Sequence, residues 1–222
     1  MKKGLFLLFA IISFGHCYSQ PTTDINRLLC NLGKQDQEVR LNLNRAVQQG
    51  IADSIAYYAQ VLATTDQTNQ LQVKQILKNG VPANLSAEAY RAIFLIVDHA
   101  DIKYQKRYFK SLYNLSKQGL IQPRDIATLR DRMLMHSNKK QIFGTQTIAK
   151  PIVIIDNSTT CQLTNYVWTV KNPANLDARR AEVGMSSMQE QIKAHASLGY
   201  QLIYDPTLSK RDIRNLTKST NK

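Results

Sequence analysis

The chain changes character at the stretch Gln141-Ile142-Phe143-Gly144-Thr145-Gln146. Patterns typical of helices precede it, and the clearest β-like run of the chain, residues 151–155, follows it. Gly144 has no Cβ, so its backbone can take a positive φ or approach another segment closely. Gln141, Thr145 and Gln146 carry neutral hydrogen-bond donors and acceptors. These three side chains are therefore candidates either for orienting a ligand or for tying a turn to its neighbours.

The part of the chain before this stretch has the apolar spacing of amphipathic helices. Between residues 25 and 32, apolar residues recur at i, i+3, i+4 and i+7, which predicts a helix beginning near Asp24. We expect Gly33 to bend or end this helix, and a break near residues 64–66 in a later one. Helical patterns continue over residues 36–49, 53–62, 71–77, 86–97 and 102–117 and from Pro123 onward. Short connections between helices predict a bundle rather than alternating strands and helices.

The C-terminal third combines short β-like runs with one more helical pattern. Residues 141–147 and 152–155 are expected to pair as a small hairpin, and residues 161–170 form either a further strand or a loop. A last helix is expected over 186–198. Residues 206–222 are basic and poor in apolar side chains, which predicts a frayed tail. The fold class predicted is mainly α: a single helical domain over 20–205 with a small β-hairpin in its C-terminal third.

The first 19 residues have the features of a signal peptide. Lys2 and Lys3 precede a short apolar run over residues 5–14, and small residues at positions 17 and 19 suit cleavage after Ser19. The alternative is a lipoprotein signal with Cys17 as the lipidated residue. Either reading predicts an exported protein, periplasmic or secreted. No later apolar run is long enough for a transmembrane segment, so the exported chain is expected to be soluble or tethered.

The charge of the chain is strongly positive. The net charge is +13, and removal of residues 1–19 takes away two lysines and no acids, which leaves +11. A basic protein is attracted to acidic surfaces, and outside the cytoplasm an envelope component is a more natural partner than nucleic acid. Scattered lysines that only maintain solubility are the alternative. Cys30 and Cys161 remain after cleavage, and they form either a disulfide or two free thiols.

An ordered set of polar motifs runs along the chain. In sequence order they are Asp36-Gln37 with Arg40, Asp66 with Asn69, Gly80-Val81-Pro82, His99-Ala100-Asp101, Asp131-Arg132, the stretch 141–146, and Arg179-Arg180 with Gly184-Met185. This set resembles a bacterial family of domains of unknown function that is frequent in exported proteins. The chain departs from the family pattern with Val81 in place of Trp and Phe143 in place of Tyr. The resemblance implies a shared fold, and it brings no established activity.

His99 is the first candidate for chemistry. It stands near the predicted end of a helix between Asp98 and Asp101, and both features favour a protonated imidazole. Such a histidine can act as a general acid or base near neutral pH. The alternative is a histidine that caps its helix and bonds a neighbour. The spacing of the histidines and cysteines matches no metal site, and no cofactor motif is present.

Asp131 and Arg132 are the second candidate pair. Adjacent residues on a helix point about 100° apart, so one of the two faces the core side. An inward Arg132 can bind a carboxylate or phosphate group through its planar fork of donors. The alternative is a buried ion pair with Asp36 or Asp101 that holds two helices together. Arg40, Arg179 and Arg180 either extend an anion-binding patch or lie in solvent.

Three functional hypotheses follow, all of which place His99, Arg132 and the stretch 141–146 at one meeting point. In the first, Arg132 binds a small anionic or polar ligand that Arg40, Asp131, Gln141, Thr145 and Gln146 help to hold. In the second, a hydrolase, His99 assisted by Asp101 activates water. In the third, the same residues form a buried polar network without a ligand.

Overall fold

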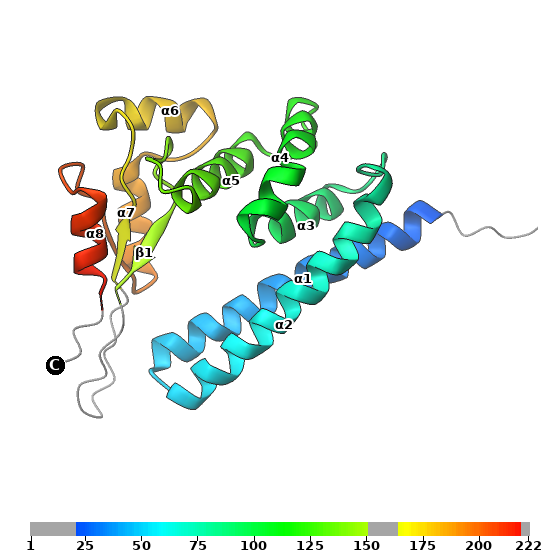
Figure 1. Cartoon of the computed structure of the whole chain (residues 1–222), viewed down its shortest axis with the longest axis horizontal. Coiled ribbons are helices and arrows are strands. Elements are labelled where there is room, and N and C mark those ends of the chain that lie inside the picture. Colours follow the sequence, from blue (N-terminus) through cyan, green and yellow to red (C-terminus); the bar gives the residue numbers. More distant parts are fainter. Residues whose placement is uncertain (1–20, 151–163, 219–222) are drawn as a thin grey trace, which may run out of the picture.

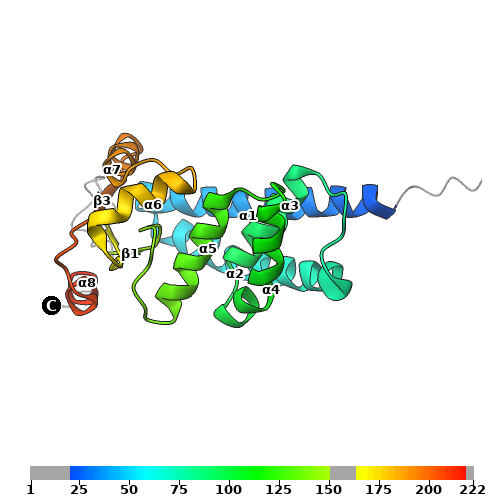
Figure 2. The same cartoon turned by 90° about the horizontal axis from the view of Figure 1, so that it is seen from above.

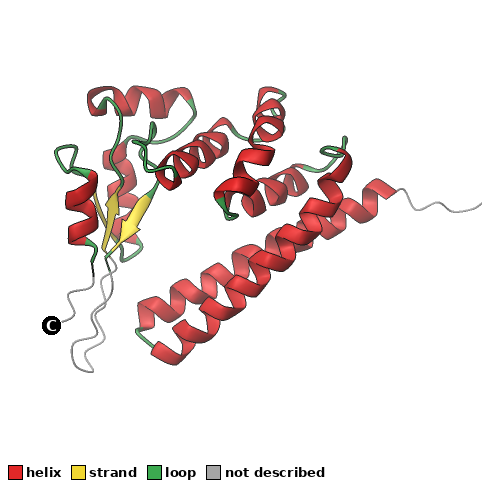
Figure 3. Ribbon diagram, in the orientation of Figure 1, coloured by secondary structure: helices red, strands yellow, loops and turns green. Residues whose placement is uncertain are grey.

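The computed structural model describes residues 21–150 and 164–218. These contain eight α-helices and three short strands, which confirms the predicted mainly α fold with a small β element in its C-terminal part (Figure 3). The predicted signal peptide lies outside the described residues, as do residues 152–155. Cys161 also lies outside them, so the alternative of a disulfide with Cys30 falls outside the described part as well. No described helix has the length and apolar character required to cross a membrane.

Two long helices form an antiparallel helical hairpin, α1 (Pro21–Gln49) and α2 (Ala52–Ile76) (Figure 1). Gly50, with φ +67°, makes the tight turn between them. Two expectations were wrong here. α1 runs without interruption through Gly33, and α2 runs through residues 64–66. The local cost of a glycine or of two threonines in a helix is about 1 kcal/mol or less each, which packing of the helical faces outweighs.

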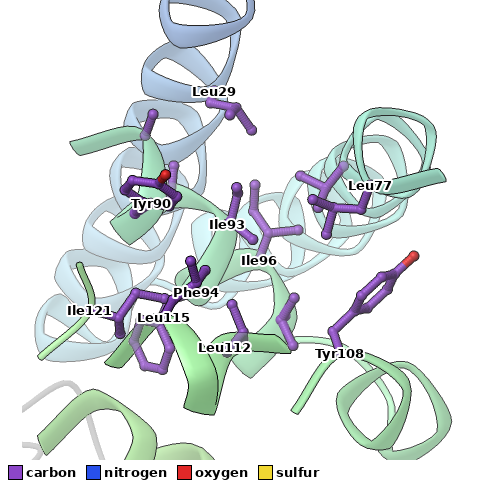
Figure 4. Close-up of a cluster of buried hydrophobic side chains, with 14 of the residues drawn as sticks. Leu29, Leu77, Tyr90, Ile93, Phe94, Ile96, Tyr108, Leu112, Leu115 and Ile121 are labelled. Atoms are coloured by element: carbon purple, nitrogen blue, oxygen red, sulfur yellow. The ribbon is translucent and has the colours of Figure 1, made fainter. Parts of the chain in front are cut away.

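Gly33 is needed because another helix crosses α1 at this point. α3 (Ala87–Asp98) packs against α1, and a Cβ built on Gly33 would lie 2.8 Å from the Cβ of Ala92. Ser86 caps α3 by accepting the N–H of Ala89 at 3.2 Å. α3 contributes most to the main core, in which its residues Ile93 and Ile96 lie between the side chains of α1, α2 and α4 (Figure 4).

Two further helices complete the helical part. α4 (Ile102–Lys117) has the predicted bounds, and Asp101 caps it by accepting the N–H groups of Lys103 and Tyr104 at 2.7 and 2.9 Å. α5 (Pro123–His136) begins at the predicted proline. Viewed from above, α3, α4 and α5 lie across the helical hairpin, and the C-terminal elements lie far from the start of α1 (Figure 2).

The β element among the described residues is a three-stranded sheet, and the second strand of the predicted hairpin lies outside them. β1 (Thr147–Ala149) pairs antiparallel with β2 (Thr164–Val167), which pairs parallel with β3 (Gln201–Ile203). An isolated bridge joins Gln141 to Val170. The strand expected within 161–170 thus supplies the partner of β1, because its pattern of β-branched and aromatic residues suits a half-buried sheet.

The C-terminal part has a small core of its own. α6 (Leu176–Glu182) and α7 (Met188–Ser197) contribute Leu176 and Met188, which pack with apolar residues of the β2 and β3 segments. The expectation of a frayed tail is wrong for residues 210–216, which form α8 (Lys210–Leu216) beside the sheet (Figure 1). Ile213 of α8 is buried, and Ser209 and Asp212 form a reciprocal capping box.

Candidate functional site

Four polar side chains from three helices meet at one place, which we call the His99 cluster: Asp36, Arg40, Asp66 and His99. Asp36 and Arg40 lie one turn apart on the same face of α1. Asp66 comes from the neighbouring part of α2, and His99 is the C-cap residue of α3. The packing of α3 on the helical hairpin therefore brings the imidazole to the two carboxylates.

Asp36 is the centre of the His99 cluster. Its side chain is only 1% exposed, and its Oδ1 lies 3.0 Å from Nδ1 of His99. The same carboxylate accepts a hydrogen bond from Nε2 of Gln37 at 2.7 Å and from Nη2 of Arg40 at 3.2 Å. Nη2 of Arg40 also lies 2.5 Å from Oδ1 of Asp66. The buried carboxylate thus fixes the orientation of both the imidazole and the guanidinium group.

The pKa values of the two carboxylates differ in direction. Burial raises the pKa of Asp36, but hydrogen bonds and charge from His99 and Arg40 outweigh it and lower the pKa to about 2. Burial raises the pKa of Asp66, and Arg40 opposes this only in part. Two carboxylates and one guanidinium group thus meet at the imidazole of His99.

One side of the His99 cluster is open to solvent. The side chains of Arg40, Asp66 and His99 are 24%, 22% and 15% exposed. Nε2 of His99 has no hydrogen-bond partner within the described part of the chain. A molecule that reaches this face therefore meets a ring nitrogen, a guanidinium group and a carboxylate next to one another.

The predicted assistance of His99 by Asp101 is wrong. The carboxylate of Asp101 accepts backbone N–H groups at the start of α4, and Asp36 occupies the position next to the imidazole. Neighbours in sequence at a helix end point in different directions, whereas Asp36 is brought in by tertiary packing.

Asp131 lies at a second polar site, which we call the Asp131 junction. The buried carboxylate of Asp131 accepts the backbone N–H groups of Ile142, Phe143 and Thr145 at 2.7, 3.0 and 3.2 Å. It also accepts the Thr145 hydroxyl at 3.1 Å. Burial raises the pKa of Asp131, and these hydrogen bonds oppose that effect. Every group around the carboxylate is a donor, which is the environment of an ionised acceptor.

The glutamines of the stretch 141–146 tie the loop to the sheet. The buried amide of Gln141 donates to the carbonyl oxygens of Gln146 and Trp168 at 3.0 and 2.7 Å, and its Oε1 accepts the N–H of Gln146 at 2.8 Å. Nε2 of Gln146 donates to Oγ1 of Thr145 at 3.1 Å. The polar atoms expected to orient a ligand thus have partners inside the protein.

Two arginines hold the opposite side of the same loop. Nη1 of Arg180 donates to the carbonyl oxygen of Phe143 at 2.7 Å, and Nε of Arg179 donates to that of Ile142 at 3.0 Å. Arg180 is buried and also bonds the carbonyl oxygen of Ser186 and the side chain of Gln191. The loop is therefore clamped between α5, which binds its N–H groups, and α6, which binds its carbonyl groups.

Arg132 pairs with a residue that sequence reasoning did not select. Its Nη2 lies 2.9 Å from Oδ2 of Asp98 on α3, rather than near Asp36 or Asp101. Asp98 comes directly after the apolar residues Ile96 and Val97 at the end of α3. A carboxylate next to such apolar residues is the sequence feature that could have indicated a buried ion-pair partner. Of the adjacent pair on α5, Asp131 is the residue that faces inward and Arg132 is partly exposed.

Apart from Arg132, which pairs with Asp98, and Asp101, which caps α4, the predicted site residues are divided between two places. Arg40 and His99 lie in the His99 cluster, whereas Asp131, Gln141, Thr145 and Gln146 lie in the Asp131 junction. In the part of the chain that is described, no hydrogen bond or ion pair joins the two. No group of three or more His, Cys, Asp or Glu residues in that part is arranged to hold a metal ion.

Comparisons with known proteins identify a family. No curated protein and no solved structure matches the chain. The model of one family, described as a family of unknown function (DUF6624), matches residues 23–202, which include both polar clusters. Because the match spans most of its length, the chain belongs to this family of unknown function.

Proposed function

We propose that the protein is exported and binds a small polar ligand at the His99 cluster. The proposal rests mainly on one observation, the 3.0 Å contact between the buried Asp36 and Nδ1 of His99. This contact leaves the other ring nitrogen without a described partner on a partly exposed side chain. A carboxylate that orients an imidazole in this way prepares its outer nitrogen to bind or to exchange a proton.

The two carboxylates beside a single guanidinium group favour a neutral ligand over an anion. Arg40 offers donors, Asp66 offers an acceptor, and Nε2 of His99 donates or accepts according to its protonation state. Hydroxyl groups can both donate and accept, so they match this combination. A hydroxyl-rich envelope component, such as a glycan fragment, suits the cluster and the proposed location outside the cytoplasm.

A hydrolase is the second candidate function, supported by the same Asp36–His99 contact. Nε2 of His99 would take a proton from water as the water oxygen attacks the substrate, and it would return that proton to the leaving group as the scissile bond breaks. Arg40 would stabilise the negative charge that develops. The carboxylate that assists is then Asp36.

The Asp131 junction is better explained as architecture than as a ligand site. Its carboxylate, amides and guanidinium groups bond the protein itself, as the third hypothesis expected. It carries no part of the proposed binding.

A thermal-shift screen tests the binding proposal. Neutral oligosaccharides, nucleotides and small acids are each added to the wild type, His99→Gln and Arg40→Gln. A ligand at about 100 times its Kd stabilises the native state by about 2.7 kcal/mol. For a chain of this size that corresponds to a rise in Tm of roughly 5 to 10 °C. We expect a neutral, hydroxyl-rich compound to produce the shift in the wild type and not in the two variants.

Arg132→Gln is the matched control, because it removes the ion pair between Asp98 of α3 and α5 and leaves the His99 cluster intact. It should lower the Tm and keep the ligand-induced shift. A shift that persists in both His99→Gln and Arg40→Gln would contradict the proposal. Product release from the stabilising compound, abolished in His99→Gln, would favour the hydrolase.

Export is tested separately by expressing the full-length chain in a bacterial host and separating the cell fractions. We expect a processed protein that begins near residue 20 outside the cytoplasm. Incorporation of a lipid at Cys17 would instead establish the lipoprotein alternative.

A further inference from the structure

A cavity lies in the C-terminal part, between the end of β2 and the segment that joins β3 to α8. Its volume is about 450 Å³, within the range of small-molecule sites. Trp168, Thr169 and Tyr204 contribute to its walls, and Lys140, Lys210 and Arg211 are the cationic residues that line it. The family match ends at residue 202, so one wall comes from residues outside the matched range.

Two residues that line this cavity carry hydroxyl groups without a partner within the described residues. The two hydroxyl oxygens are Oγ1 of Thr169 and the phenol oxygen of Tyr204, and both atoms are buried. Thr169 as a whole is only 9% exposed. A buried hydroxyl without a hydrogen bond is costly, and such groups normally have a partner in protein, water or ligand. Both residues contribute to the walls of one cavity, so an occupant that reaches these oxygens can supply the missing acceptors.

The charges around the cavity favour a negative occupant. The lining contains three cationic side chains and one carboxylate, that of Asp205. This carboxylate accepts the N–H and the hydroxyl of Thr207 at 2.8 and 2.6 Å, which lowers the pKa of Asp205 and keeps it ionised. Among the described residues, no carboxylate lies within ion-pair distance of Lys140, Lys210 or Arg211. The residues that line the space therefore carry a net charge of +2.

We propose that this cavity binds a small organic molecule that carries a phosphate or carboxylate group. The oxygen atoms of the anion accept hydrogen bonds from Thr169 and Tyr204, and the cationic side chains balance its charge. The organic part packs against Trp168, whose Nε1 is already occupied by the carbonyl oxygen of Lys139 at 2.9 Å. Burial raises the pKa of the Tyr204 phenol, so it remains a donor at neutral pH.

Trp168 is the only tryptophan in the chain, so its fluorescence reports on this cavity. The full-length protein is titrated with inorganic phosphate, glycerol 3-phosphate and succinate at constant ionic strength. We expect a saturable change in emission, with tighter binding of an organic anion than of inorganic phosphate because only the former reaches the apolar wall.

Thr169→Val and Tyr204→Phe each remove one unpaired hydroxyl and keep the shape of the side chain. Both should leave the Tm unchanged or raise it, since no protein hydrogen bond is lost, and weaken the binding of the tightest probe about tenfold or more. The double variant Lys140→Gln/Arg211→Gln should weaken it further. Lys78→Gln/Lys106→Gln removes the same charge from other helices and should retain the wild-type affinity.

Two results would overturn the proposal. One is the absence of any saturable response to the three probes up to millimolar concentrations, which would mean that the cavity holds only water. The other is a response that survives unchanged in both hydroxyl variants. These outcomes are independent of the screen at the His99 cluster, because His99→Gln should bind the anionic probes as the wild type does.

Discussion

The His99 cluster and the Asp131 junction are both built around a buried carboxylate with an arginine nearby, yet they use it differently. Asp36 is surrounded by side chains from α1 and the end of α3, and Asp131 mainly by backbone N–H groups of one loop. The first arrangement leaves an imidazole nitrogen open on one side. The second leaves no part of its carboxylate exposed.

The difference shows what distinguishes a candidate site from an architectural one. Backbone donors are consumed by the carboxylate that binds them, and the loop cannot release them without unfolding locally. Side-chain donors such as His99 and Arg40 carry additional polar atoms that can engage a second partner. The predictions that follow test this division, beginning with the largest expected effect.

Asp131→Asn should cause the largest loss of stability. It removes a buried charge that receives four hydrogen-bonding groups and places an amide N–H₂ against backbone donors. We expect the free energy of unfolding to fall by about 3 to 5 kcal/mol in denaturant titrations. Asp125→Asn on the same helix is the control, with a loss below about 1 kcal/mol, because Asp125 only faces an exposed Arg91 at 3.6 Å. Equal losses in the two variants would end the architectural interpretation.

Gly144→Ala tests the packing of the loop that Asp131 holds. Gly144 has φ +68°, and a Cβ there would lie 2.7 Å from Cε of Met188. We expect a loss of about 2 to 3 kcal/mol from backbone strain and crowding together. Gly119→Ala is the matched control, since its φ of +75° is similar but a Cβ would meet open space. It should cost about 1 kcal/mol, and a similar loss in both variants would show that the close packing contributes nothing.

Acid titration tests the His99 cluster. The pKa of Asp36 is about 2 in the folded protein against 3.8 for an unperturbed aspartate. Stability from its ionised form is therefore present above about pH 4 and is lost as the pH falls towards 2, by about 2 kcal/mol. The stability difference between the wild type and Asp36→Asn, measured in urea, should narrow by this amount over that range. A constant difference would indicate that the Asp36–His99–Arg40 interactions do not stabilise the carboxylate.

Asp66→Asn should have the smallest effect on stability. The ion pair between Asp66 and Arg40 is partly exposed on both sides, so we expect a loss of about 0.5 to 1 kcal/mol. Ligand binding at the cluster should nevertheless weaken, because Asp66 supplies its exposed acceptor. Asp24→Asn, which alters an exposed pair within α1, should leave binding unchanged.

Local patterns were enough to predict much of the helical part. The bounds of α4, the proline that begins α5 and the helix near 186–198 follow from capping, proline chemistry and apolar spacing. α6 was missed, and α8 was misjudged as a frayed tail although Ser209 and Asp212 form a readable capping pair. α8 is short and buries Ile213 alone among its residues, so the sequence of this helix contains too few apolar residues to show a helical periodicity.

The partners of the polar side chains could not be predicted from residues nearby in the sequence. His99 has carboxylates beside it in sequence, and the one that contacts it comes from residue 36 through helix crossing. Arg132 likewise binds Asp98, whereas Asp36 and Asp101 were the partners considered from the sequence. Side-chain pairing depends on the angle and register at which helices pack, and many registers satisfy the same apolar pattern.

The crossing of α1 and α3 places a further restriction on the chain. Gly33 and Ala92 are in such close contact that neither position can enlarge alone without moving the helices apart. Such a displacement would also carry His99, at the end of α3, away from Asp36. Gly33 and Ala92, which have no polar atom in their side chains, therefore set the distance between Asp36 and His99. We expect that in related chains a larger residue at one of these two positions is accompanied by a smaller one at the other.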